Sequence, residues 1–140
     1  MGTKYYLAGP MSGLPQFNFP LFYRVAKSLR AQGYDVVSPA ELDDIKDAGA
    51  ALTSKTGNPK EAKRSWGDFL ARDVKLLADG GITGIIFLPG WEKSSGAKLE
   101  AFVGLLKKFT FMRWDDDASA PVPYSGFSVL YAINRELEER

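Results

Sequence analysis

Residues 4–38 read KYYLAGPMSGLPQFNFPLFYRVAKSLRAQGYDVVS, and the changing period of their apolar residues predicts a βαβ unit. Lys4–Ala8 is a short apolar and aromatic run closed by a Gly-Pro pair, which is typical of a buried strand followed by a turn. After Asn18, apolar residues recur at the i, i+3, i+4, i+7 spacing of an amphipathic helix, and Gly33 ends it. Residues 34–38 then predict a second strand.

The same alternation continues along the chain. Asn58 has the features of an N-cap for a helix that ends near Asp79. Residues 82–88 are almost continuously apolar, which favours a strand buried on both faces of a parallel sheet. A further helix, a strand at 109–114 and a C-terminal helix at 126–140 follow. We therefore expect a small α/β doubly wound domain with a mainly parallel sheet and right-handed crossovers.

Two segments lack a clear period. Residues 41–58 predict a surface flap or lid, because long connections without structure are usually functional or disordered. Residues 115–125 are acidic and contain proline, and we interpret them as a loop. There is no internal repeat or linker, so residues 1–140 are expected to form a single domain.

The composition restricts the chemistry that is available. The chain has 140 residues and contains neither cysteine nor histidine. This excludes a disulfide framework, a thiolate nucleophile, a Ser-His-Asp triad and an HExxH metal helix. An enzyme of this composition must use Asp, Glu, Tyr, Lys or Ser, which points to carboxylate chemistry.

Charge and hydropathy narrow the possible partners and location. Lys and Arg number 18 against 17 Asp and Glu, and a net charge of +1 argues against a broadly electrostatic nucleic-acid binder. No apolar run approaches the roughly 20 residues of a membrane helix. The N-terminus lacks a signal peptide, and Tyr6 breaks the myristoylation pattern. We expect a cytoplasmic protein without a membrane or nucleic-acid partner.

Two turns follow predicted strands on the side where α/β folds bind ligands. They cover residues 8–13 and 89–96 and offer glycines and hydroxyl groups. Helix N-termini at such turns favour anions such as phosphate. Neither turn is a Walker A loop or a complete GxGxxG motif, so ATP and NAD lose their best sequence support. Alternatively, these glycines and prolines only turn the chain.

Three side chains stand out as candidate catalytic groups. Asp73 falls on the apolar stripe of its helix, which is costly for a carboxylate unless it is paired or faces a cavity. Glu100 lies close to a helix N-terminus, which should keep its carboxylate ionised. Tyr6, at the end of the first strand, could present its phenol to the same cleft. The alternatives are an Asp73 that is solvated or paired with Arg72 or Lys75, a Glu100 that only balances the helix charge, and a Tyr6 packed in the core.

Other side chains near the turns have simpler interpretations. Trp66, Trp91, Phe17 and Phe19 could stack on a planar ring, although packing is the more common role of such aromatics. The Asp115–Asp117 run could bind a divalent metal, but it lacks the spacing of a calcium loop.

Three segments together resemble the nucleoside 2-deoxyribosyltransferase-like superfamily. They are YLAGPMSG at 6–13, ARDV at 71–74 and LPGWEKSSGAKLE at 88–100, and the likeness covers residues 4 to about 112. Within that superfamily the chain most resembles a phage-associated branch related to nucleoside 5′-monophosphate N-glycosidases.

The resemblance implies a flavodoxin-like domain with four to five strands that cleaves the N-glycosidic bond of a deoxynucleoside or deoxynucleotide. By position, Glu100 corresponds to the nucleophile that attacks the anomeric carbon. Asp73 corresponds to a group acting on the base or leaving group, and Tyr6 to the residue that positions the nucleophile. It further implies that no metal or organic cofactor is needed, and that the chain forms a homodimer or larger homo-oligomer whose neighbours complete the site.

The substrate itself is less determined. Ser94 stands where transferases acting on free nucleosides carry Asp and monophosphate hydrolases carry Ser. Together with Gly9, Ser12 and Gly13, Ser94 favours a monophosphate. The other expected substrate-binding residues are Met11, Trp91 and Gly96. However, Ser12 replaces the basic residue that those hydrolases use in the first loop. A deoxyribosyltransferase and a nucleotide-binding protein without turnover therefore remain alternatives.

Overall fold

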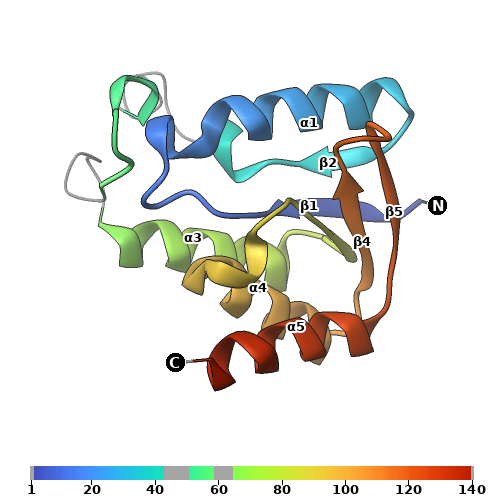
Figure 1. Ribbon diagram of the computed structural model, residues 1–140. Coiled ribbons are helices and arrows are strands. Elements are labelled where there is room, and N and C mark those ends of the chain that lie inside the picture. Colours follow the sequence, from blue (N-terminus) through green and yellow to red (C-terminus); the bar gives the residue numbers. More distant parts are fainter. Residues whose placement is uncertain (1, 43–50, 59–64, 140) are drawn as a thin grey trace.

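The computed structural model describes residues 2–42, 51–58 and 65–139, and in these residues the chain forms a five-stranded sheet (Figure 1). The strands are β1 Lys4–Ala8, β2 Asp35–Val37, β3 Gly84–Phe87, β4 Thr110–Asp115 and β5 Ala120–Tyr124. Their order is β2-β1-β3-β4-β5, with β1 to β4 parallel and β5 antiparallel to β4. This is the strand order of flavodoxin-like sheets. The predicted α/β doubly wound domain is confirmed.

Helices cover both faces of the sheet. Helix α1 lies on one face, and α3, α4 and α5 lie on the other (Figure 1). Their bounds are α1 Phe19–Ala31, α3 Trp66–Asp79, α4 Ser95–Leu106 and α5 Gly126–Glu138, with short 3-10 turns η1 Pro15–Asn18, η2 Pro39–Glu41 and η4 Trp91–Lys93. Within the described ranges, no helix combines the length and apolar character needed to cross a membrane.

The alternation of side chains along β1 separates two cores. Tyr5 and Leu7 point to the α1 face, whereas Tyr6 and Ala8 point to the face covered by α3, α4 and α5. This period of two places the Tyr6 phenol on the same side of the sheet as the two helices that carry Asp73 and Glu100.

The prediction of a loop over residues 115–125 is wrong for its second half, because Ala120–Tyr124 is the strand β5. Strand β5 lies at the edge of the sheet and pairs only with β4, so its two prolines remove no hydrogen bond to a second neighbour. The acidic run makes the hairpin turn instead, where Asp115 Oδ1 accepts from the backbone amides of Asp117 (3.1 Å) and Ala118 (3.3 Å).

The predicted start of the helix at Asn58 is also wrong. Helix α3 begins at Trp66, and Ser65, which has extended backbone, is its N-cap. The Ser65 hydroxyl accepts from the Asp68 amide, and the Asp68 carboxylate accepts from the Ser65 amide. This reciprocal capping box satisfies two amides at the helix start. Residues 59–64 lie outside the described part of the chain.

The predicted flap is described only in part, since residues 43–50 lie outside the described ranges. Residues 51–53 are helical, and Ala51 packs into the α1-side core. The following residues bond to the loop after β1: Gln16 N donates to the Ser54 carbonyl (2.7 Å), and Gly13 N donates to the Gly57 carbonyl (2.8 Å). Residues 51–57 are therefore tied to the first loop. That this segment acts as a flap or lid stays a prediction.

Candidate active site

The centre of the site is a buried hydrogen bond between Tyr6 and Glu100. Tyr6 is fully buried, and its phenol donates to Oε2 of Glu100, whose residue is only 5% exposed. The two residues are 94 positions apart in sequence, on β1 and on α4. Both residues were predicted to lie at the cleft beside the carboxyl ends of the strands, and the structure brings their side chains into contact.

Small residues allow α4 to bring Glu100 this close to the sheet. The buried face of α4 consists of Ala97, Glu100, Ala101 and Gly104. A Cβ added at Gly104 would lie 2.9 Å from Ile85 Cδ1, which is closer than such atoms approach. Helix packing distance depends on the side chains at the contact. The close approach therefore follows from the small residues on either side of the glutamate.

Asp73 reaches the same region from α3 and is 8% exposed. Arg72 Nε donates to Asp73 Oδ1 at 3.0 Å, and Arg72 NH2 donates to the Pro39 carbonyl at 3.4 Å. The guanidinium thus joins Asp73 to the segment after β2. The alternative that Arg72 pairs with Asp73 is confirmed, and the ion pair offsets the cost of placing a carboxylate on an apolar stripe.

The pKa of Glu100 is raised well above the usual value of a glutamate. Burial is the main cause and the negative charge of Asp73 adds to it, while the Tyr6 hydrogen bond and Arg72 act in the opposite direction. Burial therefore opposes the ionisation that the helix N-terminus was expected to favour at Glu100. Glu100 lies in the second turn of α4 and away from water, where the effect of the helix N-terminus is weaker and desolvation is the largest cause of the shift.

The pKa of Tyr6 is also raised well above its usual value. Burial is the largest cause, followed by the negative charges of Glu100 and Asp73. Tyr6 therefore remains a neutral hydrogen-bond donor throughout the physiological range. A permanently protonated phenol beside a desolvated carboxylate is an arrangement that orients the carboxylate and stabilises its charge. Groups perturbed in this way gather at functional sites.

The loops after β1 and β3 lie beside each other at this edge of the sheet. A Cβ added at Gly9 would come within 2.8 Å of Leu88 Cβ, so the first turn depends on glycine there. A Cβ at Gly90, where φ is +80°, would lie 3.7 Å from Pro10. Strands β1 and β3 are neighbours at the point where the strand order reverses, which is where flavodoxin-like folds bind ligands.

The predicted substrate-binding residues occupy different environments in these loops. Ser12 is exposed, Met11 packs partly against the α1-side core, and Gly13 has a φ of +85°. Ser94 is the N-cap of α4, where its hydroxyl accepts from the Ala97 amide at 3.2 Å and can still donate to a ligand. Gly96 lies in the first turn of the same helix.

The aromatic candidates pack inside the protein. Trp91 is 4% exposed, with its ring 4.3 Å from that of Phe87 and 6.4 Å from that of Tyr124. Phe17 and Phe19 are buried in the α1-side core. The side chain of Trp66 lies outside the described part of the structure. Packing is thus the role observed for Trp91, and its contact with substrate stays a prediction.

No group of three or more carboxylates that could hold a metal ion occurs among the described residues. In the Asp115–Asp117 run, Asp116 Oδ1 instead accepts from Arg24 (3.0 Å) and from the Trp114 indole (3.0 Å).

A family model described as a domain of unknown function, DUF4406, matches residues 3–110. The chain belongs to this family. A comparison with curated proteins finds no match. The DUF4406 match contains Tyr6, Asp73, Glu100 and both loops, and it ends where β4 begins. The whole candidate site therefore lies inside the family domain, whereas β5 and α5 lie beyond the match.

One polar residue near the DUF4406 site was missed by sequence reasoning. Ser38 follows β2 and precedes Pro39, the residue whose carbonyl accepts from Arg72. Ser38 is 1% exposed. Among the residues that the structure describes, its hydroxyl is the one buried polar side-chain group without a hydrogen-bond partner. The available sequence signal was a serine directly after an apolar strand. Whether that serine is buried depends on how η2 packs.

We expect Ser38→Ala to leave the free energy of unfolding unchanged or to raise it by about 1 kcal/mol, because a buried hydroxyl without a partner is costly. Ser54→Ala is the matched contrast. Ser54 is also buried, but its hydroxyl accepts from the Gly57 amide at 3.0 Å, so its removal should cost about 1–3 kcal/mol. Urea titrations of both variants test this. Equal losses from the two serines would contradict it.

Proposed function

We propose that this protein cleaves the N-glycosidic bond of (deoxy)nucleoside 5′-monophosphates. The observation that carries the proposal is the buried hydrogen bond from Tyr6 to Glu100, with Asp73 beside it, at the carboxyl edge between β1 and β3. The resemblance of the same three residues and of both loops to the nucleoside 2-deoxyribosyltransferase-like superfamily supports this reaction. Glycosidic cleavage by two carboxylates is established chemistry.

In the proposed reaction, Glu100 is the nucleophile. One of its carboxylate oxygens attacks the anomeric carbon, the bond from that carbon to the base nitrogen breaks, and the electron pair leaves with the base. Asp73 contacts the leaving base, either by hydrogen bonding or by transferring the proton that the base acquires. Water then attacks the anomeric carbon, the bond to Glu100 breaks to return its carboxylate, and the proton that the water loses passes to Asp73 or to solvent, which replaces the proton that the base acquired.

Burial and the Tyr6 hydrogen bond affect this nucleophile in different ways. Burial withdraws Glu100 from water, so that its ionised form is poorly solvated and reactive, while the Tyr6 phenol fixes the orientation of the carboxylate. No step of this scheme uses a metal or an organic cofactor, because the negative charge of the carboxylate itself stabilises the developing oxocarbenium ion.

The monophosphate is the part of the proposal that depends on the loops. Ser94 caps α4, and the free amides of a helix start favour phosphate. Lys93 and Lys98 flank this helix start and could supply positive charge. We also propose that the protein acts on small molecules in the cytoplasm as a homo-oligomer.

The reaction is tested by incubating the purified protein with a panel of deoxynucleoside and ribonucleoside monophosphates and the free nucleosides, followed by chromatography for released base. We expect base release from at least one monophosphate. A second series contains an acceptor base, because a deoxyribosyltransferase would form a new nucleoside faster than free sugar accumulates. A tight nucleotide recovered unchanged, without cleavage of any substrate, would instead favour a binding protein.

Tyr6→Phe is expected to lower kcat/KM on the order of 10²-fold, as the loss of an oriented donor does in other active sites. The Tyr6 hydrogen bond lowers the pKa of Glu100, so its removal should raise that pKa further and move the acid limb of the pH–rate profile to higher pH. Tyr5→Phe is the matched control, since Tyr5 is the neighbouring residue of β1 but points to the α1 face. A rate loss with no movement of the limb would refute a positioning role.

A further inference from the structure

Helices α4 and α5 expose an unusual amount of apolar surface. Of the eight large apolar side chains in the described ranges that are more than a third exposed, seven belong to these two helices and the eighth is Leu42. We define the α4–α5 face by six of them: Leu99, Phe102 and Leu106 of α4, and Phe127, Leu130 and Tyr131 of α5. Apolar patches of this kind mark interaction sites.

The two most exposed of these side chains belong to the ends of α4 and α5 that contact each other. Leu106 is 83% exposed and Phe127 is 89% exposed. A Cβ added at Gly126 would lie 3.5 Å from Leu105 Cδ2, so the first turn of α5 packs against the last turn of α4. Leu106 and Phe127 are the next residues along the chain, so the exposed apolar residues of the two helices come nearest to each other where α4 and α5 meet.

Helix α4 has the composition of a helix that is covered on both sides. Its inner face carries Ala97, Ala101 and Gly104, and its outer face carries Leu99, Phe102 and Leu106. A helix that is apolar all round is normally buried. Because the sheet covers only the inner face, the composition of α4 indicates a second cover on the outside.

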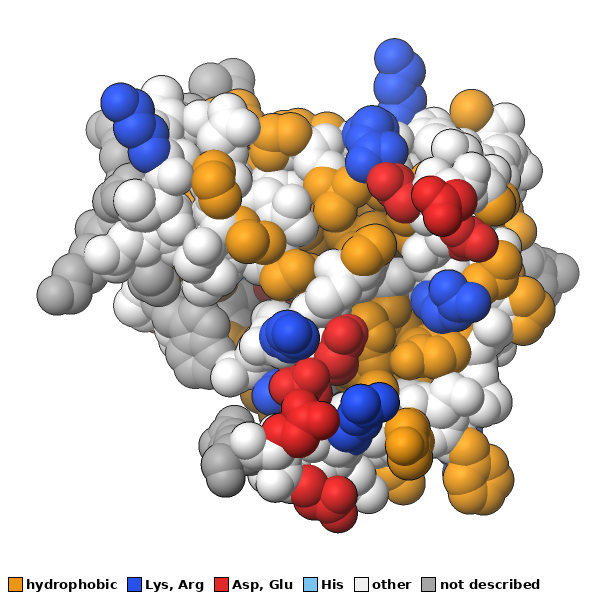
Figure 2. Space-filling view, in the orientation of Figure 1, with side chains coloured by type: hydrophobic (Ala, Val, Ile, Leu, Met, Phe, Trp, Pro, Cys, Tyr) orange, Lys and Arg blue, Asp and Glu red, His pale blue; other side chains and the backbone are white. Residues whose placement is uncertain are grey.

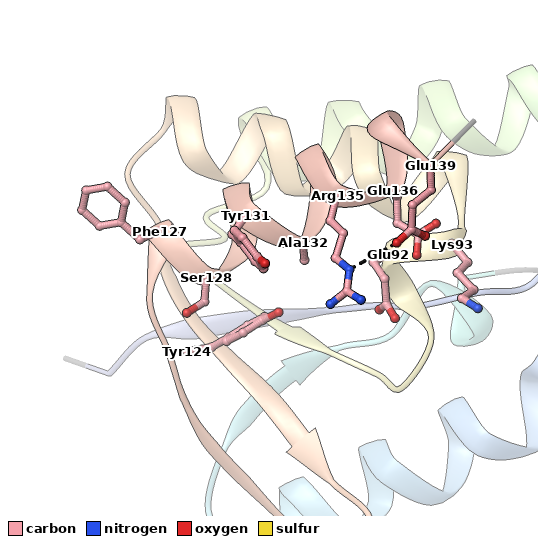
Figure 3. A pocket seen from close by; sticks show the side chains of 10 residues that line it. All are labelled: Glu92, Lys93, Tyr124, Phe127, Ser128, Tyr131, Ala132, Arg135, Glu136 and Glu139. Atoms are coloured by element: carbon pink, nitrogen blue, oxygen red, sulfur yellow. Dashed lines mark hydrogen bonds and ion pairs between the residues drawn. The ribbon is translucent and has the colours of Figure 1, made fainter.

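A groove with charges of both signs lies beside this face. It has a volume of about 760 Å³ and runs between α5 and η4 (Figure 3). Glu92, Lys93, Arg135, Glu136 and Glu139 line it, together with the aromatic rings of Tyr124 and Tyr131. In Figure 3 the Phe127 ring projects from the start of α5, away from the other lining side chains. Figure 2 shows charged side chains gathered along one stretch of the same end of the molecule, with hydrophobic ones next to them.

We propose that the α4–α5 face binds a second copy of this chain across a two-fold axis, with Leu106 and Phe127 at its centre. A two-fold contact sets the same surface against itself, so the surface must be self-complementary. An apolar centre beside a groove that carries both Lys93 and Arg135 and several glutamates meets this requirement. A strongly acidic or basic partner would instead require a groove whose charges are mainly of the opposite sign.

The size of the face also fits a second copy. From their exposed fractions, the six side chains present on the order of 800 Å², which is what each partner contributes to a standard interface. Apolar residues at the centre and charged residues at the rim are the usual arrangement in such interfaces. The contact specifies the surface for the proposed homo-oligomer and does not depend on the proposed reaction.

Light scattering coupled to gel filtration tests the assembly on the full chain, from nanomolar to high micromolar concentration. We expect a mass of about twice 15.4 kDa. Leu106→Asp and Phe127→Asp should each raise the dimer Kd about 30-fold or more, as the loss of a central contact does. Leu42→Asp is the matched control and should leave the Kd unchanged, because Leu42 is exposed but lies outside the face.

Hydrogen exchange on the unmodified protein provides a readout that does not depend on how the variants fold. Raising the protein concentration should slow exchange in residues 99–106 and 126–137. A wild-type protein that is monomeric at every concentration would overturn both this interface and the proposed assembly. A dimer that survives both substitutions, or concentration-dependent protection elsewhere, would overturn the interface alone and leave the proposed reaction untouched.

Discussion

Glu100→Gln is expected to lower base release by about 10³-fold or more, as the loss of a nucleophile does in other enzymes. The amide cannot form the bond to the anomeric carbon, but its oxygen can still accept the hydrogen bond from Tyr6. The fold should therefore persist, which circular dichroism checks. Glu138→Gln, at the exposed end of α5, is the control that should retain full activity.

The same substitution has a predictable effect on stability. The pKa of Glu100 is raised in the folded protein, so its contribution to stability is complete below its unfolded pKa and is lost as the pH rises through its folded pKa. Glutamine does not ionise and does not lose this contribution. The free energy of unfolding of Glu100→Gln, relative to wild type, should increase as the pH rises from acidic to neutral values.

Urea titrations at several pH values measure this difference. A Glu100→Gln variant that cleaves substrate at the wild-type rate would rule out the nucleophile. A difference in stability that does not change with pH would show that Glu100 is ionised as easily in the folded protein as in the unfolded chain, which contradicts the burial argument but not the reaction.

Asp73→Asn should lower kcat/KM by about 10²- to 10³-fold, the range expected when a group that assists proton transfer is lost. It should also move the acid limb of the pH–rate profile to lower pH. The negative charge of Asp73 raises the pKa of Glu100, whereas Arg72 lowers it, so removing only the aspartate charge lowers the pKa of Glu100.

This shift is opposite in direction to the one expected for Tyr6→Phe. If Asp73→Asn and Tyr6→Phe lose similar activity but move the acid limb in opposite directions, then Glu100 is the group that titrates in that limb. Asp79→Asn is the matched control, because Asp79 lies on the same helix and pairs with Lys75 at the surface (3.7 Å). Limbs that move in the same direction for Asp73→Asn and Tyr6→Phe would contradict the proposed coupling.

The elements with a strong local signal were predictable. The apolar period of residues 19–31 and the apolar runs that become β1 and β3 depend on neighbours in sequence, and each formed as expected. Strand β5 was missed because prolines normally argue against a strand, and only its place at the sheet edge makes them acceptable. The start of α3 was misplaced because Asn58 and Ser65 are both good caps.

The candidate site was predictable as a set of residues but not as an electrostatic environment. Asp73 and Glu100 stood out by their positions on helices, and the pairing of Asp73 with Arg72 was one of the alternatives, but the raised pKa of Glu100 follows from its burial. Trp91 shows the same limit, since packing was the more common role for such a ring, but its position in a turn did not identify Phe87 as the partner. Ser38 was not recognised, because its isolation from other polar groups exists only in the folded chain.

By itself, the sequence determined the βαβ order, the absence of histidine and cysteine chemistry, and the carboxylates available for catalysis. Only the tertiary structure decided that Tyr6 and Glu100, 94 residues apart, share a hydrogen bond in the interior. The physical reason is that periodicity and capping are local properties of the chain, whereas desolvation and charge coupling depend on which distant segments exclude water together. The apolar outer faces of α4 and α5 likewise became one surface only when the two helices packed side by side.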